Sequence, residues 1–181
     1  MPLAGYLCAE GITRQFRQAD LPVPVFDLAE SIDLPIDRHR FSSNICGFCS
    51  RFRGEYIVVV NSIHSDTRQR FSAAHELGHC LCHLESGVHR VFHCSTGDLL
   101  ASKSLYERQA NAFAAELLMP RRLIVEVLNT GCRKLSELAG LFYVSCEAMH
   151  WRLQTLRVDH DTDLDYVFWK TRGRLKAASS E

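Results

Sequence analysis

Several features that would place the chain in a specialised class are missing from its 181 residues. No apolar run approaches the length of a membrane span, and the N-terminus lacks the basic start and apolar stretch of a secretory signal. We therefore expect a cytoplasmic protein without membrane contact. Neither sign of charge is in excess, because 21 Lys and Arg residues face 21 Asp and Glu residues. No overall field favours nucleic acid, so partners have to be inferred from local motifs.

Cysteine is plentiful, with eight residues, but the absence of an export signal argues against a disulfide framework. We expect reduced thiols or metal ligands. Cys46 and Cys49 form the one pair at zinc-knuckle spacing, and no second pair accompanies it. The segment is better interpreted as a strand with a turn at Gly47. Alternating aspartates at 159–165 lack the glycine and the closing glutamate of a calcium loop, which leaves a solvated acidic tail.

The hydrophobic content of 46% is sufficient for one globular domain with a real core. Neither internal repeats nor low-complexity linkers interrupt it. The predicted elements, in order, are helices at 5–18 and 25–32, two or three strands within 34–61, a helix at 66–84, a loop at 86–101, helices at 104–118 and from 120 to about 129, and two short helices ending near 157. This pattern predicts the α+β class.

The most informative motif is His75-Glu76-Leu-Gly-His79. On a helix, HExxH spacing places two imidazoles one turn apart on one face, where they can share a zinc ion. The glutamate between them is then placed to take a proton from the attacking water in peptide hydrolysis. The alternative is an ordinary core helix with incidental histidines.

Neighbouring residues support a helix with the motif in its middle. Asp66-x-x-Gln69 is a plausible capping box, and apolar residues continue to about Leu84. Glycine costs about 1 kcal/mol relative to alanine inside a helix. Gly78 therefore indicates that another element packs closely behind the metal-binding face.

Catalytic zinc requires a third protein ligand, and Glu107 is the best candidate. It opens a predicted helix in which Asn111 lies one turn further on and small residues allow close helix packing. Ser104-x-x-Glu107 is itself a capping box, so Glu107 has an alternative role at the start of the helix. Glu116 and His83 are poorer rivals as ligands. His83 lies two helical turns from His75, which splays its ring away from a shared metal.

Two sequence blocks together resemble the ImmA/IrrE family of metallo-endopeptidases. The first is Arg68-Gln-Arg-Phe-Ser-Ala-Ala-His-Glu-Leu-Gly-His79, and the second is Glu107-x-x-Ala-Asn-x-Phe-Ala-x-Glu-Leu-Leu-Met-Pro120. Similarity extends from about residue 20 to 157. The resemblance implies zinc ligands at His75, His79 and Glu107, and a general base at Glu76. It also implies a zincin-like α+β fold with a small, mostly antiparallel sheet beside the two metal-binding helices. We expect a zincin-like core at 1–131, a helical segment at 132–157 and a polar tail at 158–181.

The loop between the two blocks departs from the family pattern. It carries His89, His93 and Cys94. A thiolate is a better zinc ligand than water, so Cys94 at the fourth zinc position would hold the peptidase latent. A loop thiol without this role is the alternative. His93, His89 and Tyr106 are candidates to stabilise the tetrahedral oxyanion.

Residues 132–157 resemble a helix-turn-helix segment, with Ser145 capping its second helix. Four basic side chains can contact phosphates there: Arg133, Lys134, Arg152 and Arg157. The stretch is only mildly basic and lacks base-reading side chains at the helix start. We expect a module packed on the core that docks a protein substrate or an activating nucleic acid.

Two functions follow from these motifs. The first is a zinc endopeptidase that, as the resemblance implies, cleaves a helix-turn-helix (XRE-like) repressor and so releases a stress, mobile-element or phage-defence response. DNA or single-stranded DNA is a candidate activator. The second is a DNA-binding regulator or sensor with structural zinc. Glu76 argues against the second function, because structural zinc needs no general base.

Overall fold

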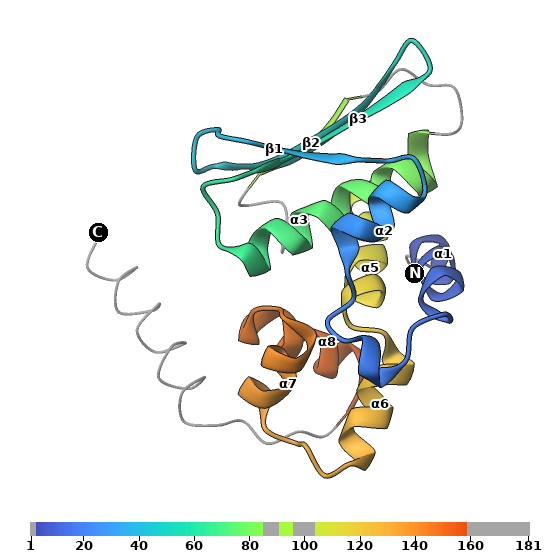
Figure 1. Cartoon of the computed structure of the whole chain (residues 1–181), viewed down its shortest axis with the longest axis vertical. Coiled ribbons are helices and arrows are strands. Elements are labelled where there is room, and N and C mark those ends of the chain that lie inside the picture. Colours follow the sequence, from blue (N-terminus) through green and yellow to red (C-terminus); the bar gives the residue numbers. More distant parts are fainter. Residues whose placement is uncertain (1–2, 85–90, 96–103, 159–181) are drawn as a thin grey trace, which may run out of the picture.

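The computed structural model describes residues 3–84, 91–95 and 104–158, with the backbone alone for 3–4 and 91–95. Figure 1 shows a small sheet at one end of the molecule, with helix α3 (Asp66–His79) lying along it. Helix α5 (Leu105–Leu118) packs against the other side of α3. Helices α6 (Arg121–Asn129), α7 (Leu135–Phe142) and α8 (Cys146–Leu156) gather at the opposite end. The predicted α+β class is confirmed.

The sheet consists of β1 (Ile36–His39), β2 (Ile45–Phe52), β3 (Glu55–Asn61) and β4 (Val91–Ser95), in the order β1-β3-β2-β4. Strands β2 and β3 form an antiparallel hairpin, and Gly54 supplies a positive φ of 93° at its turn. Strand β1 pairs with β3 in parallel. The mostly antiparallel sheet is confirmed, with this one parallel pair.

Strand β4 corrects the prediction of a loop at 86–101, because the backbone of 91–95 pairs antiparallel with β2. Ladder hydrogen bonds to a neighbouring strand stabilise this segment, and such long-range pairing leaves no local sequence signal. The turn predicted at Gly47 is also wrong. Gly47 lies inside β2, next to a register shift between Ile45 and Gly47.

The N-terminal helices precede the sheet. Helix α1 spans Leu3–Thr13, shorter than predicted, and the 3-10 turn η1 (Gln18–Asp20) follows it. Helix α2 (Val25–Ser31) agrees closely with its prediction. Helix α1 packs against α5, so the start of the chain covers the helix that carries the second sequence block.

Helix α3 begins differently from the prediction. Its N-cap is Ser65, and the proposed capping box of Asp66 and Gln69 does not form. Instead, Gln69 Nε2 donates to the carbonyl oxygen of His64 at 2.7 Å and so fastens the preceding turn. After His79 the chain continues as a π-helical turn, η2 (Cys80–Leu84).

Two contacts fasten the C-terminal helices to the core. Arg152 of α8 is buried, and it donates through Nη2 to Glu116 Oε2 and through Nε to the Met119 carbonyl at 3.0 Å. Arg70 of α3 donates through Nε to the Tyr143 carbonyl at 3.2 Å. Ser145 caps α8 by accepting from the backbone N–H of residue 148, as predicted. Arg152 therefore serves packing and is not exposed to phosphates.

One continuous cluster of buried apolar side chains runs from α2 through α3 and α5 to α8. It includes Leu77, Phe113, Leu117, Phe142 and Met149. Among the described helices, none is both long and apolar enough to cross a bilayer. The metal-motif helix and the C-terminal helices thus share a single core.

Candidate metal centre

Helices α3 and α5 bring three potential ligands together. His75, His79 and Glu107 each offer one ligand atom, and these atoms lie within 4.8 Å of one another. The two Nε2 atoms are 3.1 Å apart. Glu107 Oε2 lies 3.1 Å from Nε2 of His75, and Oε1 lies 3.2 Å from Nε2 of His79. Within the residues that the structure describes, this is the one cluster with metal-ligand composition and spacing.

Helical geometry and close packing produce this arrangement. His75 and His79 are four residues apart and so lie on one face of α3. Gly78 allows α5 to approach, because a Cβ there would lie 3.0 Å from Cβ of Phe113 and 3.1 Å from Cα of Ala110. This crossing brings the first turn of α5, with Glu107, over the two histidines. The close packing predicted from Gly78 is confirmed.

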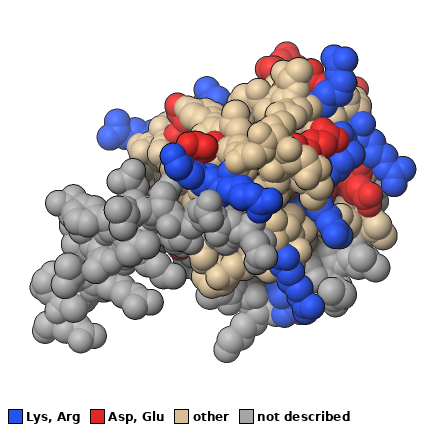
Figure 2. Space-filling view, turned by 90° about the horizontal axis from the view of Figure 1, so that it is seen from below, with Lys and Arg blue, Asp and Glu red and all other residues tan. Residues whose placement is uncertain are grey.

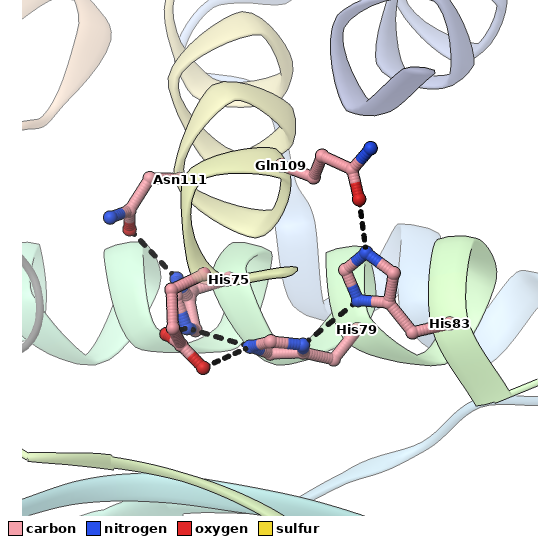
Figure 3. Close-up of polar contacts among 6 residues, drawn as sticks. His75, His79, His83, Gln109 and Asn111 are labelled. Atoms are coloured by element: carbon pink, nitrogen blue, oxygen red, sulfur yellow. Dashed lines mark hydrogen bonds and ion pairs between the residues drawn. The ribbon is translucent and has the colours of Figure 1, made fainter. Parts of the chain in front are cut away.

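The proton on His75 is fixed by Asn111. Nδ1 of His75 lies 2.9 Å from Oδ1 of Asn111 (Figure 3), and an amide oxygen only accepts hydrogen bonds. Nδ1 therefore carries the proton, and Nε2 presents its lone pair toward His79 and Glu107. A carboxylate and imidazole lone pairs at about 3 Å repel one another unless a cation or proton lies between them. The donor set fits a divalent metal ion with nitrogen and oxygen ligands.

The three residues also shift one another's pKa values. Burial lowers the pKa of His79 to about 4, so its ring is neutral and suited to metal binding. For His75, burial lowers the pKa, but the contacts with Glu107, Glu76 and Asn111 outweigh it and raise the pKa overall. Burial also raises the pKa of Glu107, but the contacts with the two imidazoles outweigh it and leave the pKa below its usual range.

Glu76 lies close to the same residues, beside the thiol of Cys49 on β2. It is fully buried, and neither carboxylate oxygen accepts a hydrogen bond from an N–H or hydroxyl group of the described residues. Burial raises its pKa to about 7, although His75 and the Cys49 thiol act in the opposite direction. Gly47 of β2 lies beside this carboxylate, and a Cβ there would come within 2.7 Å of the Val59 carbonyl oxygen on β3. A buried carboxylate with a pKa near neutrality is suited to accept and return protons.

Among the described side chains, the other residues that the sequence suggested as ligands or oxyanion stabilisers lie outside the three-ligand cluster. His83 lies beside His79, outside the three-ligand cluster, and Glu116 pairs with Arg152. Tyr106 is 41% exposed at the start of α5, and its ring meets the His83 ring edge-on at 5.0 Å. Glu107 faces the imidazoles, and Ser104 makes no side-chain cap hydrogen bond to the helix.

Three of the predicted residues cannot be compared with the structure. His89 lies outside the described residues, as do the side chains of His93 and Cys94 and the whole acidic tail from 159. The backbone places Cys94 opposite Gly47 in the register of β2 and β4. Latency through Cys94 and the oxyanion role of His93 and His89 stay predictions.

Two residues at the site were not identified from the sequence. Gln109 of α5 accepts a hydrogen bond from His83, and Gly47 of β2 lies beside Glu76. No sequence signal indicated the first, because its contact with His83 depends on how α5 packs against η2. No sequence signal indicated the second, because it arises from sheet register.

Comparisons with known proteins agree with this geometry. Residues 33–154 match the peptidase family described as the IrrE N-terminal-like domain. The chain is 28% identical over 125 residues to an uncharacterized immunity region protein of Bacillus phage phi105, covering 69% of this chain and 76% of that protein. It is 34% identical over 105 residues to the radiation response metalloprotease IrrE of Deinococcus radiodurans, covering 54% of this chain and 30% of that one. With the metallopeptidase ImmA of Bacillus subtilis the identity is 32% over 74 residues, covering 41% and 40%.

A solved structure shares the fold. A Mycobacterium tuberculosis transcriptional regulator aligns with a TM-score of 0.56 at 15% identity, covering 82% of this chain and 46% of that one. The chain therefore spans less than half of this structure, of IrrE and of ImmA. The family model, in contrast, covers most of the present chain, and it includes both helices of the metal centre. The chain belongs to the metallopeptidase family described as the IrrE N-terminal-like domain, with an α+β fold of the zincin type.

Proposed function

We propose that the protein is a zinc-dependent, site-specific endopeptidase in which His75, His79 and Glu107 hold the metal and Glu76 is the general base. The observation that carries this proposal is the convergence of three ligand atoms within 4.8 Å beside a buried carboxylate that neither an N–H nor a hydroxyl group satisfies. Structural zinc sites close all four positions with protein ligands and need no free carboxylate. Catalytic sites keep three protein ligands and one open position.

The chemistry divides between the metal and the chain. A zinc ion held by these ligands would polarise the scissile carbonyl and lower the pKa of a water molecule. Glu76 takes the proton from the attacking water and later delivers it to the leaving amine. Its pKa of about 7 suits both transfers near neutral pH, and its burial keeps bulk water away.

The proposed substrate class rests on the family resemblance and on the names of two relatives. One relative is named as an immunity region protein of a phage, and another as a radiation response metalloprotease. We propose a helix-turn-helix (XRE-like) repressor as substrate, so that its cleavage derepresses a stress, mobile-element or phage-defence response. DNA or single-stranded DNA is the proposed activator.

The alternative, a DNA-binding regulator with structural zinc, has weaker support. Arg152 of the helix-turn-helix-like segment is buried against Glu116. Lys134 pairs with Glu137 at 3.2 Å, which neutralises part of the remaining positive charge. Figure 2 shows Lys and Arg side chains interleaved with Asp and Glu on the face seen from below, without a continuous basic surface over its described part. Phosphate binding requires such a surface.

Cleavage of a repressor is the direct test. The purified protein is incubated with zinc and a helix-turn-helix repressor encoded beside it, with and without DNA, and the products are identified by mass spectrometry. Glu76→Gln should lower the cleavage rate by about 10²- to 10⁴-fold and retain zinc. Glu30→Gln, which removes the charge of an exposed glutamate on α2, should cleave like the wild type.

Two outcomes would contradict the proposal. One is a cut that Glu76→Gln makes at the wild-type rate. The other is a wild-type protein that binds zinc and operator DNA but cleaves nothing under any condition, which would favour the regulator.

Latency through Cys94 has a separate test. If its thiolate occupies the fourth zinc position, Cys94→Ser should cleave without the activator. Equal basal cleavage by Cys94→Ser and the wild type would rule out the switch and leave the peptidase proposal unaffected.

A further inference from the structure

His83 connects the metal centre to a residue that no motif includes. It lies in the π-helical turn η2, four residues after His79, and it is 8% exposed. Its Nδ1 lies 3.0 Å from Nδ1 of His79, and its Nε2 lies 3.0 Å from Oε1 of Gln109 on α5. Figure 3 shows the three side chains as one line that leads from the metal-binding face of α3 to α5.

The hydrogen-bond partners determine where each proton lies. The amide oxygen of Gln109 only accepts, so Nε2 of His83 donates to it. In a neutral imidazole the other nitrogen is then an acceptor, which leaves Nδ1 of His83 without a proton. Nδ1 of His79, at 3.0 Å, must therefore donate to Nδ1 of His83. Nε2 of His79 consequently presents its lone pair toward His75 and Glu107.

We infer that His83 and Gln109 are positioning residues that hold His79 in the tautomer and ring orientation required for metal binding through Nε2. This inference rests on the proposed metal site. The other imidazole ligand is oriented in a similar way, because Asn111 accepts directly from Nδ1 of His75. Helix α5 thus supplies Glu107 as a ligand and orients both histidines, one directly and one through His83. Hydrogen bonds of this kind fix ligand geometry and raise ligand basicity.

Helix α1 packs against both elements that carry these contacts, α5 and η2. A Cβ at Gly5 of α1 would overlap the carbonyl oxygen of Gln109. Glycine therefore allows α1 to lie directly against the backbone of α5 at Gln109, and α1 also packs on η2, which carries His83. Both positioning residues are thus held by α1, a helix that contributes no ligand among the described residues.

Four variants separate the acceptor role of His83 from its packing. His83→Leu removes the acceptor. His83→Asn places an amide oxygen near the position of Nδ1 and restores it, whereas His83→Gln places its amide near the position of Nε2, out of reach of His79. Gln109→Leu removes the group that fixes the tautomer of His83. His39→Leu, at an exposed position on β1, is the matched control for loss of an imidazole.

Zinc affinity, measured by competition with a chromophoric chelator, is the first readout, and the visible absorption of the cobalt(II) form is the second. His83→Leu and His83→Gln should bind zinc about 10- to 100-fold more weakly than the wild type, with a changed cobalt spectrum. His83→Asn should recover most of the affinity and the wild-type spectrum. Gln109→Leu should show a smaller loss, and His39→Leu none. If His83→Leu does not fold, the difference in zinc affinity between His83→Asn and His83→Gln tests the positioning role by itself.

The possible failures are distinguishable. A wild-type protein that binds neither zinc nor cobalt would overturn the proposed metal site itself. Wild-type binding that is lost in Glu107→Gln but unchanged in His83→Leu or His83→Gln would overturn the positioning role and leave the metal site intact. If Asn and Gln at position 83 weaken zinc binding equally, an acceptor near the position of Nδ1 is not required, and the positioning role is overturned.

Discussion

The two ends of α5 hold buried charged groups under opposite conditions. At its C-terminal end, Glu116 accepts from Arg152 and from the backbone N–H of Arg121, so both oxygens are satisfied. At its N-terminal end, Glu107 and the histidines converge on one point, and no N–H or hydroxyl group of the described residues donates to Glu76 nearby. Both regions lie in the same apolar core.

The satisfied charges at one end of α5 stabilise the fold, whereas the unsatisfied charges at the other end indicate a ligand site. Burying a polar group without a hydrogen bond costs free energy, so native structures satisfy nearly all of them. The satisfied pair at the C-terminal end fastens α8 to the core. The unsatisfied groups at the other end have no structural benefit, and a ligand is the physical reason to keep them. The comparison predicts that substitutions at the two ends affect different quantities.

The largest expected effect on stability is at the satisfied end. Arg152→Leu leaves Glu116 buried without its charged partner, which costs about 3–5 kcal/mol of unfolding free energy. Urea denaturation followed by circular dichroism measures this loss. Zinc affinity of the folded protein should not change, because Arg152 contacts neither ligand residues nor Glu76.

The double variant Glu116→Leu with Arg152→Leu is the control. Replacing both charges by apolar side chains removes the unpaired carboxylate and should recover most of the lost stability. If the double variant is as unstable as Arg152→Leu, the pair contributes something other than mutual compensation, and the contrast between the two ends is weakened.

At the unsatisfied end, removal of the charge should stabilise the metal-free protein. Burial raises the pKa of Glu76 from 4.5 to about 7, so the folded state binds its proton more tightly than the unfolded chain does. The resulting loss of stability is absent below about pH 4.5, grows as the pH rises, and is complete above pH 7. A shift of this size corresponds to about 3 kcal/mol.

Glu76→Gln should therefore be about 3 kcal/mol more stable than the metal-free wild type at pH 8 and nearly equal to it at pH 4.5. Denaturation at both pH values in the presence of a chelator is the measurement. A stability difference that does not depend on pH would mean that Glu76 is not an isolated buried carboxylate.

Alanine substitutions at two glycines should have the smallest effects on stability, and these effects should have opposite signs. Gly78→Ala adds a methyl group 3.0 Å from Cβ of Phe113 at the crossing of α3 and α5, and should cost about 1–3 kcal/mol and weaken zinc binding. Gly140→Ala in α7 meets nothing within 4 Å and should gain about 0.5–1 kcal/mol from helix propensity. Thermal unfolding and zinc competition measure both variants. Equal effects at the two glycines would contradict the close crossing.

The sequence predicted the parts of the site that depend on local spacing. HExxH on a helix placed His75 and His79 together, and Gly78 indicated the close crossing that brings Glu107 near. Ser145 as a helix cap and the strand before α3 were also predicted correctly. These features follow from periodicities of a few residues.

Features that depend on long-range pairing were not predicted. Strand β4 was assigned to a loop, and Gly47 was assigned to a turn although it lies in β2 beside Glu76. Arg152 was considered for phosphate binding, but its partner Glu116 lies 36 residues away. Gln109 gained its role through the proximity of η2, which the sequence predicted as plain α-helix.

Zinc-edge X-ray absorption on the zinc-loaded protein tests the central claim most directly. With His75, His79 and Glu107 as ligands, the first shell contains two nitrogens at about 2.0–2.1 Å and carboxylate oxygen at about 2.0–2.2 Å, and Glu107→Gln changes it. A shell dominated by sulfur at about 2.3 Å, with no change in Glu107→Gln, would place the metal on the cysteines and contradict the account.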